Sequence, residues 1–258
     1  MSVIRYNPKQ ITFQVTPANY NKDHQIEAID QISGKVITSL ISKEGFMPFG
    51  ESIPSINRFY IIYCSSGIQP NTIQGKTPMP VYTAKIFCAK NESEILSCES
   101  RYYVPAVFFD KNRVVIISRI ADTILVDRPS IINYKAAVFS LGLLSDDESV
   151  QSIFTQISID YAPDIILKEG IIGLVYNSGH IAINTINQKN VCPNYVAGVF
   201  WLDDGEKIVS RNSINYIPRI YFPFSEIEIV GQTNGSTPII ERVRFDIYGD
   251  FLWSEVIK

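Results

Sequence analysis

The sequence is poor in the residue types that carry most enzyme chemistry, with only two histidines and four cysteines in 258 residues. No two cysteines have C-x-x-C spacing, and no cysteine–histidine cluster has the spacing of a zinc site. Gly-rich phosphate loops and a G-x-S-x-G motif are also missing. We therefore expect a protein that is not an enzyme, without catalytic residues, metal ligands or a cofactor.

Long hydrophobic runs and excess positive charge are lacking as well. Hydrophobic residues make up 46% of the chain, yet no run approaches the roughly 18 apolar residues that a membrane helix needs. Met1–Tyr6 lacks the apolar core of a signal peptide. The formal net charge is -3, which disfavours direct binding of nucleic acid through a basic surface. We expect a globular protein with no membrane span and no signal peptide.

An internal duplication is the strongest positive signal in the sequence. When the chain is shifted by 113 residues, segment 58–109 matches segment 171–222 without gaps, with 17 identities in 52 positions. In the clearest stretch, Ile95-Leu96-Ser97 and Tyr103-Val104-Pro105 match Ile208-Val209-Ser210 and Tyr216-Ile217-Pro218. The shared residues are mainly apolar, aromatic or proline, which favours a repeated fold over a repeated binding site.

Weaker matches with gaps extend the two copies over the whole chain. They predict one domain at 1–128 and a second at 129–258, with an insertion near 223–238 in the second copy. The first copy has 14 Lys and Arg against 11 Asp and Glu, and the second has 9 against 15. Two related domains of opposite net charge can attract each other, within one chain or between chains. Drift of charge after the duplication explains the difference equally well.

Strand signals dominate both copies. Phe59–Tyr63, Val81–Cys88 and Tyr102–Phe109 are rich in β-branched and aromatic residues, and turn signals recur about every 10 residues. Pro105 and Pro218 lie in strand-like runs and predict edge strands or bulges, because proline cannot donate to a ladder. Loose helical spacing at 23–40 and 146–159 predicts a short helix or two in each copy. The fold class is therefore all-β, with two tandem, internally duplicated β-sandwich (jelly-roll-like) domains.

Few residues are candidates for chemistry, and each has a simpler interpretation. His180 lies near serines, but its context is that of a turn between strands, and His24 lies in a polar run. The acidic runs 146–148 and 203–204 are typical of solvated turns and lack the spacing of a calcium loop. Cys88 and Cys98 flank a predicted turn, where a disulfide is one alternative to small apolar residues in a reducing compartment. The free-thiol interpretation also applies to Cys64 and Cys192.

In its plan, the chain resembles double jelly-roll viral capsid proteins, which have two β-sandwiches in tandem. The resemblance rests on architecture: two copies of about 130 residues each, nearly all β, with no family motif matched. It implies a non-enzymatic structural subunit of a virus or phage particle, pseudo-symmetric through its duplication. The implied partners are other copies, with a trimer favoured, and other particle proteins. The implied location is the virion, assembled in the host cytoplasm.

Two alternatives to the particle subunit stay open. Paired β domains in trimers also occur in phage tail and baseplate components. A carbohydrate-binding or adhesion module would use the long polar loop in the second copy, because polar loops on rigid sandwiches often carry recognition. The candidate recognition loop consists of Thr233, Asn234, Gly235, Ser236 and Thr237.

Overall fold

In the part of the chain that the structure, a computed structural model, describes, the regular secondary structure is almost entirely β-strand. The described residues are 10–18, 22–68, 79–123, 130–142, 149–185, 188–233 and 239–257. Their strands form five antiparallel sheets, and their single helical segment is a 3₁₀ turn at Pro54–Ile56. The all-β fold class predicted from the sequence is confirmed. None of the described residues forms a helix long and apolar enough to cross a membrane.

The chain divides into two compact units, each of which is described by itself. Unit 1 contains residues 1–120 and 140–151, and unit 2 contains residues 121–139 and 152–258. The strands β10 (Asn133–Leu141) and β11 (Val150–Ile159) contribute residues to both units. The predicted domain boundary after residue 128 stays a prediction.

Unit 1 contains two sheets that pack face to face as a sandwich. Phe59 and Ile61 of the second sheet pack in one core cluster with Ile26 and Ala28 of the first, and all four are fully buried. The rings of Phe59 and Phe87 stack at 4.9 Å between centroids. The first sheet has the order β1 (Ile11–Ala18), β2 (Asp23–Asp30) and β3 (Val36–Ser42). The second has the order β4 (Phe49–Ile53), β5 (Arg58–Ile68), β6 (Met79–Cys88) and β7 (Glu94–Arg101), and a hairpin of β8 (Ala106–Asp110) and β9 (Arg113–Arg119) follows.

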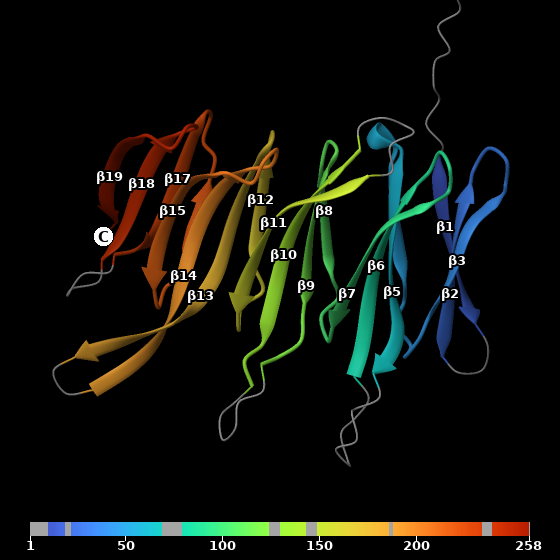
Figure 1. The fold of residues 1–258 in the computed structure, drawn as a ribbon, viewed down its shortest axis with the longest axis horizontal. Helices are drawn as coiled ribbons and strands as arrows, with labels where there is room; N and C mark the ends of the chain where they lie inside the picture. The colour runs from blue at the N-terminus through green and yellow to red at the C-terminus, as the bar shows by residue number, and fades with distance from the viewer. Residues whose placement is uncertain are drawn as a thin grey trace, which may run out of the picture. The chain divides into compact units, whose positions relative to one another are not determined.

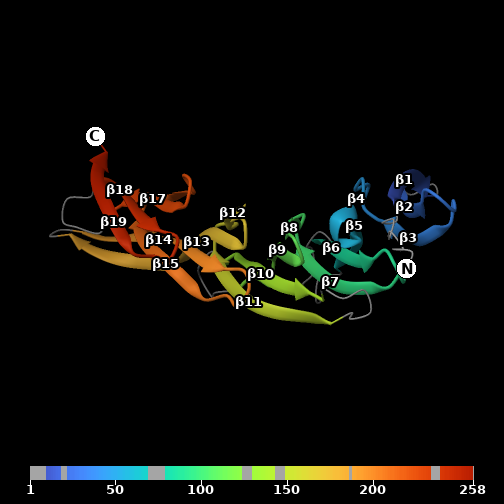
Figure 2. The same cartoon turned by 90° about the horizontal axis from the view of Figure 1, so that it is seen from above.

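Unit 2 contains a second sandwich, and Figure 2 shows its red strands β17 to β19 over the orange strands β13 to β15. Its core joins Val175 and Val199 of one sheet with Ile229 and Val243 of the other. The first sheet has the order β12 (Asp164–Lys168), β13 (Ile171–Thr185), β14 (Gln188–Trp201) and β15 (Lys207–Ile214). The second has the order β16 (Arg219–Tyr221), β17 (Glu226–Gln232), β18 (Ile240–Asp246) and β19 (Phe251–Ile257) (Figure 1).

A buried serine near the end of the last strand recurs from sheet to sheet. The hydroxyl of Ser42 on β3 accepts a hydrogen bond from the backbone N–H of Cys64 on β5, at 3.0 Å. We call this contact the serine clamp, because it ties one sheet to the second strand of the next. The same clamp joins Ser100 to Arg119 at 2.8 Å, Ser158 to Asn177 at 2.9 Å, and Ser213 to Gln232 at 2.9 Å.

The clamps reveal a repeat that is shorter than half the chain. The four serines are 58, 58 and 55 positions apart in the sequence. Each ends a motif of the form Ile-x-Ser/Thr-x-x-Ser in which the central hydroxyl residue is exposed and the last serine is buried. The spacing marked by the clamps is therefore that of a single sheet, and each copy proposed from the sequence contains two of the four clamp serines. The four motifs begin at Ile37, Ile95, Ile153 and Ile208.

The strand registers follow the same shift of 113 as the sequence match. Ala106 of β8 pairs with Ile117 of β9, and Arg219 of β16 pairs with Val230 of β17. This register places β17, a counterpart of β9, where the sequence predicts an insertion near 223–238. Pro105 and Pro218 each precede a short edge strand, β8 or β16, so the strand predicted at 102–109 begins only at Ala106.

The helices predicted at 23–40 and 146–159 are wrong where the structure describes those residues. Segment 23–42 forms the strands β2 and β3, and segment 150–159 forms β11. In β2, Ile26, Ala28 and Asp30 are buried at every second position, which is the period of a strand. Residues 143–148, including the acidic run 146–148, lie outside the described residues.

Candidate interaction surface

Strand-end turns of both sheets meet at one end of unit 2. Lys168 pairs with Ile171 across the β12–β13 turn, and Glu226 pairs with Asp246 next to the β18–β19 turn. The N–H of Leu202, after β14, donates to the carbonyl oxygen of Gly170 at 2.8 Å. This end of the unit therefore presents the turns 169–170, 202–206, 222–225 and 247–250.

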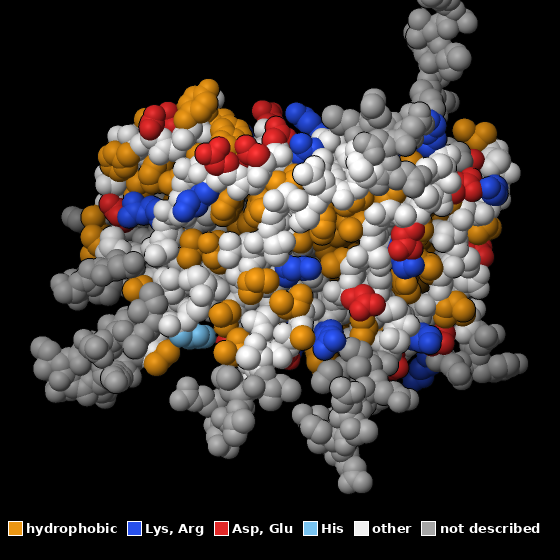
Figure 3. Space-filling view, in the orientation of Figure 1, with side chains coloured by type: hydrophobic (Ala, Val, Ile, Leu, Met, Phe, Trp, Pro, Cys, Tyr) orange, Lys and Arg blue, Asp and Glu red, His pale blue; other side chains and the backbone are white. Residues whose placement is uncertain are grey.

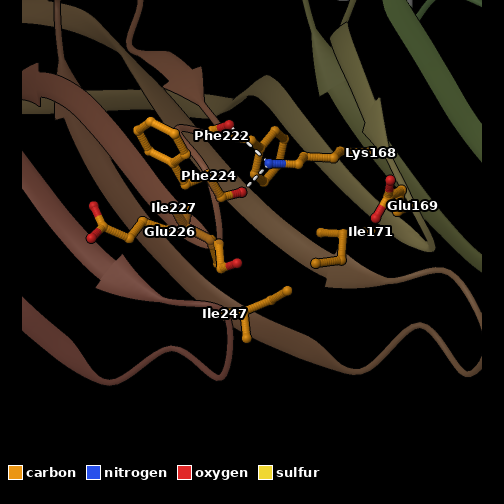
Figure 4. Close-up of a pocket in the computed structure, with 9 residues that line it drawn as sticks. Lys168, Glu169, Ile171, Phe222, Phe224, Glu226, Ile227 and Ile247 are labelled. Carbon is orange, nitrogen blue, oxygen red and sulfur yellow. Dashed lines mark hydrogen bonds between the residues drawn. The ribbon is translucent and has the colours of Figure 1, made fainter.

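Lys168 holds the turn between β16 and β17 in place. Its ammonium group donates to the backbone oxygen of Phe222 at 3.0 Å and to that of Phe224 (Figure 4). Phe224 has a φ of 52° and lies in the left-handed region, which is uncommon for a side chain of this size. The two hydrogen bonds from Lys168 offset the cost of this conformation. The ring of Phe224, 95% exposed, is thereby presented to solvent on a fixed backbone.

A small pocket, open to solvent, lies beside this turn. Ile171 and Ile227 from the facing sheets and Ile247 from the β18–β19 turn contribute apolar side chains to it (Figure 4). Glu169 and Glu226 also line it. The carboxylate of Glu226 is already bound to the guanidinium of Arg244, with 3.0 Å between Nη1 and Oε2, so its charge is compensated.

Further hydrophobic side chains are exposed beside the pocket. Tyr248 and Phe251 are 76% and 62% exposed. The β18–β19 turn that carries Tyr248 is fixed, because Asp246 Oδ1 accepts hydrogen bonds from the N–H groups of Tyr248 at 2.9 Å and Asp250 at 2.8 Å. Figure 3 shows acidic side chains beside hydrophobic ones at this end of β17 and β18. We call Phe224, Tyr248 and Phe251 the aromatic end surface.

The chemistry that this surface supports is binding by burial of apolar area. Each aromatic ring buries about 150–250 Å² when covered, at roughly 25 cal/mol per Å². The backbone of both turns is already hydrogen-bonded, so a partner would not have to order it on binding. Exposed aromatic residues grouped on a soluble protein are typical of protein contacts.

The titration behaviour of the described residues fits structural roles. Burial, together with a 2.8 Å hydrogen bond to Glu51, raises the pKa of Tyr60 well above its usual range. Burial and a short hydrogen bond to Asp164 raise the pKa of Tyr161 in the same way. Both phenols keep their protons, and each donates a hydrogen bond to a carboxylate, that of Glu51 or of Asp164. No group of three or more His, Cys, Asp or Glu in the described parts is placed to hold a metal ion.

The candidate recognition loop is only partly described. Thr233 lies at its base, where its N–H donates to the carbonyl oxygen of Ile239 at 2.8 Å. The Thr233 hydroxyl accepts a hydrogen bond from the N–H of Ile239 at 3.3 Å. The other four predicted residues of the loop, Asn234, Gly235, Ser236 and Thr237, lie outside the described residues.

The structure does not group the other candidates into a site. His180 is exposed on β13 opposite Pro193, next to a bulge, whereas His24 lies on β2 in unit 1. Asp203 and Asp204 are exposed in the β14–β15 turn, where Asp204 accepts a hydrogen bond from the N–H of Glu206 at 2.8 Å.

The cysteines are all free thiols, as the simpler interpretation of the sequence predicts. Cys98 pairs with Ala84 across the β6–β7 ladder and therefore does not face Cys88. Cys88 lies at the end of β6, where its sulfur accepts a hydrogen bond from the buried guanidinium of Arg58 at 3.0 Å.

Sequence reasoning missed the aromatic end surface. Its one visible signal is Phe222-Pro223-Phe224, because two phenylalanines flanking a proline between two strands are too apolar for an ordinary solvated turn. Lys168 has no such signal, because it lies 54 positions before Phe222 and only the fold brings the two together.

Comparisons with known proteins place the chain in no family. No family model matches it, and no curated protein does. Among solved structures, a similar one is described as the crystal structure of the eukaryotic initiation factor, with 10% identity and a TM-score of 0.20. The match covers 99% of this chain and 89% of that one. At that TM-score, the likeness carries no argument about fold or function.

Proposed function

We propose that this chain is a non-enzymatic structural protein that works through contacts with other proteins, as a subunit of a virus or phage particle. Its first partner is a second copy of the same chain, in a homo-oligomer with a trimer as the favoured state. Other particle proteins are the remaining partners, and the location is the virion after assembly in the host cytoplasm. The viral setting rests on the resemblance to double jelly-roll capsid proteins.

The aromatic end surface is the observation that carries the proposal of protein contacts. Phe224 and Tyr248 expose most of their side chains on turns that are held by hydrogen bonds, and Phe251 exposes most of its side chain at the start of β19. Solvated turns of a sandwich need no such residues, and exposed rings lower solubility unless something covers them. A covering partner would gain their burial at little ordering cost.

Charge complementarity favours a second copy as that partner. Unit 2 carries exposed acids in the turns of this end, among them Asp203, Asp204 and Glu206. The first half of the sequence has a net charge of +3 and the second a net charge of -6. A contact between the end of unit 2 and the first half of another copy would bring opposite charges together and would weaken at high salt.

Replacing two of the rings tests the proposal. The variant Phe224→Ser/Tyr248→Ser should lower the native mass toward that of a monomer, as measured by light scattering after size exclusion. The control Val191→Ser removes a side chain that is 65% exposed on β14, and it should keep the mass of the natural protein. An oligomer that survives in the double variant would contradict this interface.

A carbohydrate-binding or adhesion module is the second candidate, because exposed aromatic rings on fixed turns also stack on sugars. In that case a monomer would bind glycans, and deletion of the candidate recognition loop, 233–237, would abolish the binding without unfolding the protein. A phage tail or baseplate component is a variant of the first proposal, with the same surface and the same test.

A further inference from the structure

The serine clamp fixes which positions correspond in the two sheets of unit 2. Asn177 of β13 and Gln232 of β17 both donate their N–H to a clamp serine. Counting back from them, Val175 corresponds to Val230, and Gly173 corresponds to Glu228. Across the ladder Val175 pairs with Ala197, whereas Val230 pairs with Arg242. The face of the sheet β12–β15 that carries Val175 can therefore be compared, residue by residue, with the face of β16–β19 that carries Val230.

In the sheet β12–β15, this face is apolar and covered. Ile171, Val175, Ala197 and Val199 are buried in the core that the sheet forms with β16–β19. Gly173 belongs to the same face, and a Cβ atom there would lie 3.1 Å from Ile220 of the covering sheet. The face is therefore built for close contact with another sheet.

In the sheet β16–β19, the corresponding face is charged. Glu226, Glu228, Arg242 and Arg244 stand at the positions of Ile171, Gly173, Ala197 and Val199, which we infer from the ladder pairs. We call these four side chains, together with Glu255 of β19, the charged lattice.

The charged lattice is paired by charge within the sheet, although the buried Nε of Arg242 makes no hydrogen bond. Arg244 Nε lies 2.8 Å from Glu228 Oε2, and Arg242 Nε lies 3.3 Å from Glu228 Oε1. Arg242 Nη1 lies 2.7 Å from Glu255 Oε1, and the guanidinium of Arg244 lies 4.8 Å from the ring centre of Trp253. Glu228 is only 8% exposed and so depends on both arginines for its charge compensation. Covering this face would desolvate the guanidinium groups of Arg242 and Arg244 and the carboxylate of Glu255, with no new partners in an apolar surface to offset the cost.

The last strand of this sheet differs in a second respect. The clamp serine of β15, Ser213, pairs with Tyr195, the residue that also pairs with Asn177. The residue in the same place on β19 is Ile257, which pairs with Ile240 opposite Gln232. Isoleucine has no hydroxyl group and cannot accept the N–H of a following sheet. The charged lattice and the missing serine are independent features with the same consequence.

From these two features we infer that β16–β19 is a capping sheet, whose outer face does not take a further sheet, whether from this chain or from a second copy. Terminal units with a polar outer face keep stacked repeats from associating end to end. The inference concerns a different face from the aromatic end surface and holds whether or not that surface binds a partner.

An exchange of the lattice for apolar residues tests the inference. The variant Glu226→Ile/Glu228→Ala/Arg242→Ala/Arg244→Val keeps the net charge and makes this face similar to that of β12–β15. We expect its native mass, measured by light scattering, to rise with protein concentration and to exceed that of the natural protein. The control replaces the same four residues with Gln, which keeps the net charge and a polar face, and it should keep the natural mass.

Equal masses for the natural protein and the apolar variant would overturn the inference, and so would loss of the natural mass in the Gln control. If circular dichroism shows that the fourfold apolar variant is unfolded, Arg242→Ala/Glu255→Ala is compared with Arg242→Gln/Glu255→Gln. Both variants remove Arg242 from beside Glu228, so any loss of stability is common to the two and their difference reports the polarity of the face. If only the variant with two alanines associates, the result supports a capping sheet. If the two variants have the same native mass, the inference is overturned.

Discussion

Replacement of a clamp serine should destabilise the protein far more than replacement of an exposed serine on the same strand. Ser42 is fully buried, and its hydroxyl donates to the carbonyl oxygen of Phe46 at 2.9 Å while it accepts the N–H of Cys64 at 3.0 Å. In Ser42→Ala, the carbonyl group of half-buried Phe46 can turn to water. The N–H of Cys64, a fully buried residue, loses its acceptor. A buried unsatisfied donor costs about 1–3 kcal/mol, and that is the expected loss in the free energy of unfolding.

The matched control is Ser39→Ala, three positions earlier on β3. Ser39 is exposed, and its hydroxyl accepts a hydrogen bond from the exposed amide of Gln25 at 2.9 Å, so its removal should cost less than about 0.5 kcal/mol. The free energy of unfolding of both variants is measured by urea unfolding followed by far-ultraviolet circular dichroism. Tryptophan fluorescence is less suitable, because the two tryptophans lie in the second half of the chain and the two serines in the first. Equal midpoints for the two variants would refute the idea that the clamp ties the sheets together.

Two further predictions concern a buried phenol and a constrained glycine. The raised pKa of Tyr60 means that the folded state keeps a proton that the unfolded state loses above about pH 10, so this stabilisation is complete below that pH and declines above it. Tyr60→Phe should flatten the fall of the unfolding free energy above pH 10, by up to about 1.4 kcal/mol per pH unit, and an unchanged slope in urea titrations would contradict this. Gly249 has a φ of 94°, and an added Cβ would lie 2.6 Å from the carbonyl oxygen of Ile208. Gly249→Ala should therefore lower the thermal midpoint more than Gly34→Ala, whose Cβ would meet nothing within 4 Å, and equal shifts would show that the close contact does not matter.

The fold class could be predicted because strand propensity is local. Runs such as Phe59–Tyr63 contain β-branched and aromatic residues that favour strands in any context, and they form β5. The helices predicted at 23–40 and 146–159 failed for a related reason. Short segments of mixed polarity fit both the 3.6-residue period of a helix and the two-residue period of a strand. At β2 and β3, pairing between the two strands decided the outcome.

The repeat was only partly visible from the sequence. The match at a shift of 113 is strong because residues of several types recur together, among them Pro80 and Pro105, Tyr82 and Tyr103, and Ser97 and Ser100. The shorter spacing rests on a motif with two hydroxyl residues and one isoleucine, which is too sparse to stand out. Only the four serine clamps show that residues such as Ser42 and Ser100 make the same hydrogen bond in successive sheets.

The aromatic end surface was out of reach of sequence reasoning for a physical reason. Exposure is a property of the folded chain, and Phe224 has the same local sequence whether a partner, a core or solvent covers it. The ladder of β17 and β18 brings the turns of Phe224 and Tyr248 to one end, and Lys168 comes from a different sheet.

The native mass of the purified protein tests the central proposal most directly, by light scattering after size exclusion at low and high salt. A structural subunit that assembles through the aromatic end surface should form a closed homo-oligomer, a trimer in the favoured case, which weakens as salt rises. A monomer at high protein concentration and low salt would contradict the proposal and turn attention to glycan binding.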